Sequence, residues 1–290
     1  MQIQSLSICV PGGCVNKCKF CVSRMHEEKN YINQIEKNTR FRDLYKKDYK
    51  KRIAFARDNG CNTVMLTGDG EPLINKKFIE DFFEWNDHLN DSFRWIEIQT
   101  SGAMLDDEYL RFLRNGGVNT ISLSLSSVFS DEENYEYNCP VKKEFMINIE
   151  KLCAEIKRYD FNLRLSLNMT DWYNKKNAAE IFERVKSLGA NQVTFRVLYK
   201  SGTNNPQDLW IDEHKCVDSV INEIKDYVKT NGKALEILPF GATKYSVGEI
   251  STVIDDDCMN TKVGDTLKYL IIRPDCKLYS KWDDKGSLIF

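Results

Sequence analysis

The sequence predicts an α/β protein built as a partial (β/α)6 barrel of the TIM type, with a small C-terminal β-hairpin extension. Six strand-like segments alternate with six amphipathic helical segments, a pattern typical of right-handed crossovers and a parallel sheet covered by helices. A length of 290 residues suits one barrel with an appendage. Six units fit a partial barrel better than a complete eight-stranded one.

The predicted elements follow one another in a regular order. Strands are expected at residues 2–10, 62–68, 93–100, 118–126, 161–169 and 191–198. Helices are expected at residues 43–60, 76–90, 106–117, 142–159, 175–190 and 212–230. Segments 32–42 and 201–207 follow strands and are expected as loops on the rim where such folds build their sites. Residues 1–230 would form the barrel, and residues 231–290 a small C-terminal cap.

Strands three to six alternate between polar and apolar residues, although strands buried on both faces are usually apolar throughout. The polar positions are Glu97, Gln99, Ser122, Ser124, Ser126, Arg164, Ser166, Asn168, Thr194 and Arg196. We expect these side chains to line a polar lumen. The alternative is an open antiparallel sheet with one solvated face, which the intervening helices make topologically awkward. Buried Glu97, Arg164 and Arg196 would pair with one another or bind a charged ligand.

Composition narrows the class of protein and the compartment. Forty-one Lys and Arg against 43 Asp and Glu give a net charge of −2, which argues against a nucleic-acid partner held by phosphate neutralisation. No apolar stretch approaches the ~20 residues of a membrane span, and the N-terminus does not resemble a signal peptide. We therefore expect a cytoplasmic protein whose ten cysteines are thiols or metal ligands.

Three cysteines lie within the run CVNKCKFC, directly after the first predicted strand. Cys14, Cys18 and Cys21 have the spacing C-x3-C-x2-C, one ligand short of the four that closed zinc and iron–sulfur sites usually take. Zinc could complete such a site with Cys9 or His26. A cluster whose fourth position is filled by another molecule is the other interpretation.

A second motif, TGDGEPL, follows the second predicted strand and should lie on the same rim as the cysteines. Gly68 and Gly70 allow the backbone to approach a ligand closely. Glu71 offers a carboxylate to a cation, and Pro72 fixes the exit of the turn. The two motifs lie one strand–helix unit apart, which indicates a joint site.

These motifs resemble those of the radical SAM superfamily, over about residues 1–230. GDGEP is similar to the family's GGEP motif, with Asp69 in second place, and aromatic Phe20 precedes the last cysteine. Within the superfamily the chain is most similar to the branch of the molybdenum cofactor biosynthesis protein A. QTSGAML is similar to that branch's T-N-G turn, with Ser101 replacing Asn, and ISLSLSSV to its serine-bearing strand.

The resemblance implies a cofactor pair and a set of site residues. Cys14, Cys18 and Cys21 would hold three irons of a [4Fe–4S] cluster, with S-adenosylmethionine (SAM) on the fourth. Reductive cleavage of SAM would yield a 5′-deoxyadenosyl radical that abstracts hydrogen from the substrate. The implied cofactor-binding residues are Phe20, Gly68, Asp69, Gly70, Glu71, Ser101, Ser124 and Asn168. Glu97, Arg164 and Arg196 are the expected substrate residues. Flavodoxin or ferredoxin would be the type of electron donor.

The C-terminal segment LKYLIIRPDCKLYSKW predicts a hairpin around Pro274-Asp275. It resembles the strand–turn–strand of SPASM and twitch extensions, in which a turn glycine is followed five residues later by a cluster-binding cysteine. Here Cys276 occupies the glycine place and Lys281 the cysteine place. Cys258 and Cys276 are too few for a second cluster, so we expect a cap without its own metal.

The predicted substrate is a small polar molecule, anionic or nucleotide-like, because guanidinium groups pair well with carboxylate and phosphate. Two alternatives stay open. One is a radical SAM enzyme that modifies a peptide or protein. The other is a non-catalytic protein that binds an iron–sulfur cluster or zinc.

Overall fold

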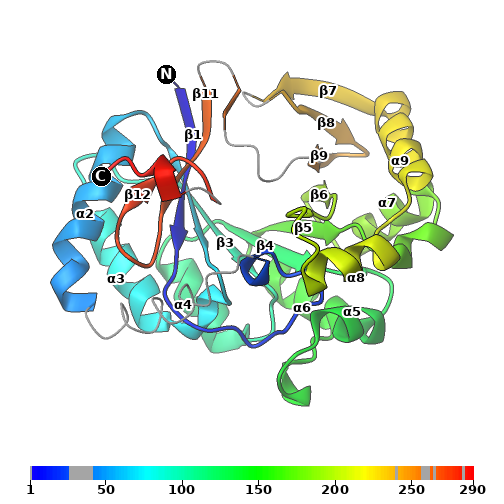
Figure 1. Cartoon of the computed structure of the whole chain (residues 1–290), viewed down its shortest axis with the longest axis horizontal. Helices are drawn as coiled ribbons and strands as arrows, with labels where there is room; N and C mark the ends of the chain where they lie inside the picture. The colour runs from blue at the N-terminus through cyan, green and yellow to red at the C-terminus, as the bar shows by residue number, and fades with distance from the viewer. Residues whose placement is uncertain (1, 26–41, 239–240, 256–261, 264–265, 283–284) are drawn as a thin grey trace.

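A computed structural model describes residues 2–25, 42–238, 241–255, 262–263, 266–282 and 285–290. Its centre is a curved sheet with helices on the outer side (Figure 1). The strands are β1 Gln2–Cys9, β2 Thr63–Thr67, β3 Trp95–Thr100, β4 Thr120–Leu125, β5 Asn162–Asn168, β6 Gln192–Arg196, β7 Gly232–Ile237, β8 Thr243–Val247, β9 Ile250–Asp255, β10 Lys262–Val263, β11 Thr266–Ile272 and β12 Leu278–Tyr279.

The helices lie between the strands, as the alternating pattern predicts. They are α2 Arg42–Asp58, α3 Lys76–Asp87, α4 Asp107–Asn115, α5 Asp131–Asn138, α6 Ile149–Arg158, α7 Ala178–Ser187, α8 Pro206–His214 and α9 Asp218–Asn231. Short 3₁₀ turns occur at η1 Val22–Arg24, η2 Pro72–Ile74, η3 Lys143–Phe145, η4 Asp171–Lys175 and η5 Lys285–Ser287. Within the described residues, no helix is long and apolar enough to cross a membrane.

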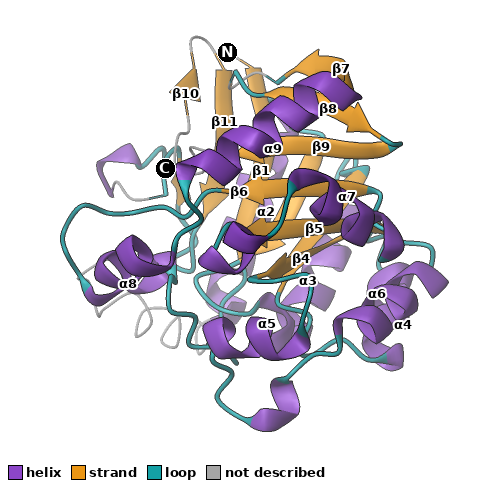
Figure 2. Ribbon diagram, turned by 90° about the vertical axis from the view of Figure 1, so that its right-hand side faces the viewer, coloured by secondary structure: helices purple, strands orange, loops and turns teal. Residues whose placement is uncertain are grey.

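Strands β1 to β6 pair in parallel in their sequence order, which confirms the partial barrel and excludes the antiparallel alternative. The C-terminal part adds a parallel strand at each edge: β11 beside β1, and β9 beside β6. Figure 2 shows β9, β8 and β7 continuing the sheet beyond β6. The sequence predicted only a hairpin after residue 230. The boundary at that residue stays a prediction, while strands from both sides of it share one sheet.

Two predicted helices are in fact interrupted. The segment 142–159 contains the short turn η3 and then α6, which Asn148 caps by accepting a hydrogen bond from the Lys151 amide. Helix α5 precedes it and was not predicted, because its sequence DEENYEYN has almost no apolar residue to mark a buried face. The segment 212–230 divides into α8 and α9, and the loop predicted at 201–207 gives way to α8 at Pro206. Most of the predicted loop 32–42 lies outside the described residues.

The C-terminal hairpin is present and forms from β11 and β12. Cys276 lies in its turn with a backbone φ of 60°, a left-handed conformation that glycine adopts at no steric cost. This is the position where the resemblance placed a turn glycine. Because β11 pairs with β1, the hairpin extends the sheet at its edge.

Each strand has one apolar face buried under the helices. Leu6, Leu66, Ile98, Leu123 and Leu165 are fully buried in this outer layer. The inner faces of the strands carry the polar residues. The fold therefore uses hydrophobic burial on the outer side only, and the inner side is left for a ligand.

An ion pair joins the two outer strands of the parallel array. Lys268 Nζ on β11 lies 3.4 Å from Asp255 Oδ1 on β9, and the two side chains are 4% and 11% exposed. No backbone pairing joins β9 to β11 in the described part of the chain. The ion pair therefore bridges the opening of the partial barrel.

Removing Lys268 should destabilise the fold, because Asp255 would be left as a buried charge. Breaking a buried pair from one side costs roughly 3–5 kcal/mol. We expect Lys268→Met to lower the free energy of unfolding in urea by about 3 kcal/mol. Adding Asp255→Asn should recover part of that loss. A loss below about 1 kcal/mol for the single variant would show that the pair does not hold the opening.

Candidate active site

The cysteine loop follows β1 and ends in η1. Cys14 is exposed, Cys18 and Cys21 are partly exposed, and all three are free thiols. Backbone hydrogen bonds anchor the loop to the end of α5: Lys17 N donates to Asn138 O (3.1 Å) and Cys139 O (2.9 Å), and Lys19 N to Tyr137 O (3.0 Å). The thiols are therefore presented by a loop fixed at a helix end.

The loop favours neutral thiols until a metal binds. Removal from water raises the pKa of Cys14 to about 11, with a smaller contribution from the charge of Glu71. The pKa of Cys18 is raised by burial first and then by Cys21 and Cys14. A metal centre would reverse this effect, because its charge stabilises thiolates and releases their protons. Three thiols on one loop suit an iron–sulfur cluster, in which each thiolate binds a different iron.

The GDGEP turn lies directly against the cysteine loop. Glu71 N donates a hydrogen bond to Gly13 O at 2.9 Å. A Cβ atom at Gly70 would lie only 2.1 Å from that same carbonyl oxygen, so the backbones approach as closely as glycine permits. The structure thus brings together the two motifs as the sequence predicted.

Glu71 is buried, and its carboxylate joins the turn to the end of β3. One oxygen accepts from the Thr100 hydroxyl (2.6 Å) and Leu73 N (3.3 Å), and the other from Ser101 N (2.9 Å) and Oγ (2.6 Å). These four hydrogen bonds use the acceptor positions of the carboxylate. Contact of Glu71 or Ser101 with the SAM amine or carboxylate stays a prediction. The observed task of Glu71 is to position the turn, and Thr100 is a partner that the sequence did not reveal.

Asp69 has acceptor capacity left. Its Oδ2 atom is buried and has no hydrogen-bond partner among the described residues. Burial raises the pKa of Asp69 to about 6, an effect that the charge of Arg273 opposes. Asp69 and Arg273 both act electrostatically on the buried thiol of Cys9, which packs against the C-terminal hairpin. Contact of Asp69 with the cofactor stays a prediction.

The other predicted cofactor residues lie on the same side of the barrel. Asn168 Nδ2 on β5 donates to Ser124 Oγ on β4 at 3.1 Å, so these two form one polar unit in the lumen. The ring of Phe20 packs on Trp210 of α8 with ring centroids 6.0 Å apart. No observation assigns a ligand to these residues, and their roles stay predictions.

Sequence reasoning missed two polar groups beside the cysteine loop. The Cys18 thiol donates to Asn138 Oδ1 at 3.9 Å, and the Ser126 hydroxyl donates to the same oxygen at 2.6 Å. Nearby, the Tyr137 hydroxyl donates to Asp171 at 2.7 Å, and His214 Nδ1 lies 3.2 Å from that carboxylate. Asn138 and Tyr137 lie on α5, whose sequence has no helical apolar pattern, so no local signal placed them here.

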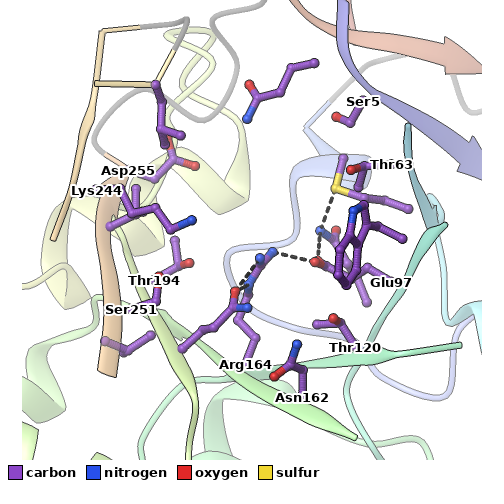
Figure 3. A pocket seen from close by; sticks show the side chains of 18 of the residues that line it. Ser5, Thr63, Glu97, Thr120, Asn162, Arg164, Thr194, Lys244, Ser251 and Asp255 are labelled. Carbon is purple, nitrogen blue, oxygen red and sulfur yellow. Dashed lines mark hydrogen bonds and ion pairs between the residues drawn. The ribbon is translucent and has the colours of Figure 1, made fainter. Parts of the chain in front are cut away.

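The lumen contains a cavity of about 500 Å³, lined by all three predicted substrate residues. Figure 3 shows Glu97 and Arg164 in this lining. Arg164 Nη1 lies 2.5 Å from Glu97 Oε2, and the same guanidinium donates twice to Gln192 Oε1. Arg196 differs, because its Nε is buried without a hydrogen-bond partner among the described residues. Glu97 and Arg164 therefore satisfy each other, and Arg196 keeps capacity for a ligand.

The described residues contain no preformed zinc site. No three His, Cys, Asp or Glu side chains there are grouped closely enough to hold one metal ion. Cys9 is buried against Ile271 and Tyr279. His26, the other proposed zinc ligand, and Cys258 lie outside the described residues. A cluster distributes its thiolates over several irons, so it does not require that all three converge on one ion.

Comparison with known proteins agrees with the site. The sequence profile of the Radical SAM superfamily matches residues 8–145. No curated protein matches the sequence of this chain. The fold is similar to that of Streptococcus suis SuiB bound to S-adenosylmethionine, with a TM-score of 0.59 and 13% identity over 96% of this chain and 60% of SuiB.

Two further solved structures are similar in fold. Coproporphyrinogen III oxidase (HemN) from Escherichia coli, described as a radical SAM enzyme, has a TM-score of 0.57 and 16% identity over 89% of this chain and 57% of HemN. Native anSMEcpe with bound AdoMet has a TM-score of 0.61 and 14% identity over 99% of this chain and 77% of that protein.

The solved structures confirm the partial-barrel fold. The match to the Radical SAM superfamily agrees with the prediction of a [4Fe–4S] cluster and SAM as cofactors. The chain spans about 60% of the length of SuiB. The placement in the branch of the molybdenum cofactor protein and the SPASM detail stay predictions. The chain therefore contains a radical SAM domain, since residues 8–145 match the model of the Radical SAM superfamily.

Proposed function

We propose that this protein is a radical SAM enzyme acting on a small polar substrate that is anionic or nucleotide-like. The bound cluster and SAM would supply reductive cleavage of the sulfonium and a 5′-deoxyadenosyl radical that takes hydrogen from the substrate. The observation that carries this proposal is the backbone contact between the cysteine loop and the GDGEP turn. This contact brings the loop of three cysteines and the turn that we propose to bind SAM to one end of a polar lumen.

The protein's own residues hold and shield the cofactors. Cys14, Cys18 and Cys21 would bind three irons and leave one coordination position for SAM. Gly70 lets the turn reach the cysteine loop, and the GDGEP turn would bind the SAM amine. An electron from a donor of the flavodoxin or ferredoxin type would enter through the cluster. This partner is inferred from the chemistry alone.

The lumen supports the choice of a small substrate. A cavity of about 500 Å³ is in the range that holds metabolites. Its charged lining and the unsatisfied Nε of Arg196 favour a ligand with a carboxylate or phosphate group. SuiB has been solved with its precursor peptide SuiA, so a peptide substrate is the competing proposal, with one side chain inserted into the lumen.

Anaerobic purification tests the proposed chemistry. We expect a brown protein with about four irons per chain that forms 5′-deoxyadenosine when given SAM and dithionite. Cys18→Ser should lose most of the iron and all 5′-deoxyadenosine formation. Cys153→Ala, which removes a buried core thiol, is the matched control and should keep both. A colourless protein with stoichiometric zinc would contradict the proposal and support the non-catalytic alternative.

Gly70→Ala should separate SAM binding from cluster binding. The new methyl group would collide with the Gly13 carbonyl and push the turn away from the cysteine loop. We expect the Kd for SAM to rise at least about tenfold, equivalent to 1.4 kcal/mol, while the iron content changes little. Gly12→Ala is the control, because its Cβ would meet only ordinary contacts at 3.6 Å. Equal SAM affinity in both variants would show that the close contact between Gly70 and the Gly13 carbonyl is not needed for SAM binding.

A further inference from the structure

The cavity in the lumen lies at the end of the barrel opposite to the cofactor site. Most of its lining comes from the N-terminal halves of the strands: Gln4, Ser5, Thr63, Trp95, Thr120, Asn162, Arg164, Gln192 and Ser251. The cysteine loop and the GDGEP turn follow the C-terminal ends of β1 and β2. In β6 and β9 the lining continues along the strand to Arg196 and Asp255. The cavity thus leads from the N-terminal end of the barrel toward the cofactor end.

The rim at this N-terminal end is accessible. The Trp95 side chain begins β3 and is 53% exposed, although it also lines the cavity. A large aromatic side chain exposed at a cavity entrance can contact a planar or apolar part of a ligand. Across the entrance, the β7–β8 hairpin contributes Glu236 and Lys244, which form an ion pair of 3.3 Å.

The charges of the lining do not balance. Four cationic residues (Arg164, Arg196, Lys244, Lys268) and three carboxylates (Glu97, Glu236, Asp255) surround the cavity. Each carboxylate is in an ion pair with one cation, at 2.5, 3.3 and 3.4 Å. Arg196 is the cation left over. Among the described residues it has no ion-pair partner, and its Nε is buried without a hydrogen bond.

We infer that the N-terminal end of the barrel is an anion-selective ligand entrance that leads to Arg196. A carboxylate or phosphate group entering here would neutralise Arg196, the cation of the lining that has no ion-pair partner among the described residues. The remaining polar side chains would bind the rest of the ligand. This inference rests on the proposed function only in identifying the ligand as the substrate.

An entrance at this end has a consequence for the order of binding. SAM would occupy the C-terminal end of the lumen, so a ligand that enters from the opposite end need not pass it. Substrate and SAM would therefore bind independently, and the substrate could exchange while SAM stays bound.

Labelling of an engineered cysteine tests the entrance without knowledge of the substrate. Thr194 lines the cavity (Figure 3), two residues before Arg196 on β6. Thr194→Cys places a thiol there in the full-length protein. The probes are the anionic sulfonatoethyl and the cationic trimethylammonium-ethyl methanethiosulfonates, each normalised to its rate with free cysteine. Peptide mass spectrometry restricts the readout to residue 194, and circular dichroism checks folding.

We expect the anionic probe to react at least about fivefold faster than the cationic one, and saturating SAM to change either rate less than about twofold. Arg196→Gln in the same background should bring the ratio close to one. Ser251→Trp, at the entrance, should slow both probes more than about tenfold if it blocks the path.

Three results would overturn the inference. Equal normalised rates in the Thr194→Cys protein would exclude anion selection. Labelling that SAM blocks and that Ser251→Trp leaves unchanged would place the entrance at the cofactor end. No labelling by either probe would exclude an open path. The labelling assay does not involve cluster chemistry. It can therefore contradict the proposed entrance while SAM cleavage is still observed, and it can support the entrance in a protein that does not cleave SAM.

Discussion

The close approach of two backbones, at Gly13 and Gly70, is the constraint on which the site depends. The cysteine loop follows β1 and the GDGEP turn follows β2, and a hydrogen bond of 2.9 Å from Glu71 N to Gly13 O fixes one against the other. Glu71 then ties the turn to Thr100 and Ser101 at the end of β3. Three neighbouring strand ends are thus joined into one frame that can hold a cluster and its organic ligand in a defined relation.

The lumen follows from the same sheet. Parallel strands are usually apolar on both faces, and this chain keeps only the outer face apolar. Inside, Glu97 and Asp255 are paired with Arg164 and Lys268, which limits the cost of burying charge. At the exposed entrance Glu236 is paired with Lys244. Arg196 interrupts this balance. Among the described residues its guanidinium has no ion-pair partner, which supports the proposal that an additional negative group binds here.

Much of the fold and part of the site could be predicted from the sequence. Apolar residues repeating every two positions located β1 to β6, and those repeating every 3.6 positions located most of the helices. Because the cysteine run and the GDGEP motif each follow a strand, the sequence also predicted that these two motifs would meet. The acidic helix α5 gave no apolar pattern, so Asn138 and Tyr137 could not be placed. The pairings of β9 and β11 with β6 and β1 join residues far apart in the chain, and no local propensity encodes them. The hydrogen bonds that Thr100 and Ser101 donate to the Glu71 carboxylate likewise depend on tertiary contact, so the sequence did not reveal them.

The central claim is that the cysteine loop leaves one iron position for SAM. Electron–nuclear double resonance of the reduced protein tests it directly, with SAM labelled by ¹⁵N in the amino group and ¹⁷O in the carboxylate. Binding at the open iron predicts hyperfine coupling of both nuclei to the cluster. A cluster spectrum that labelled and unlabelled SAM leave unchanged would mean that a protein side chain fills the fourth position, and the account would be wrong.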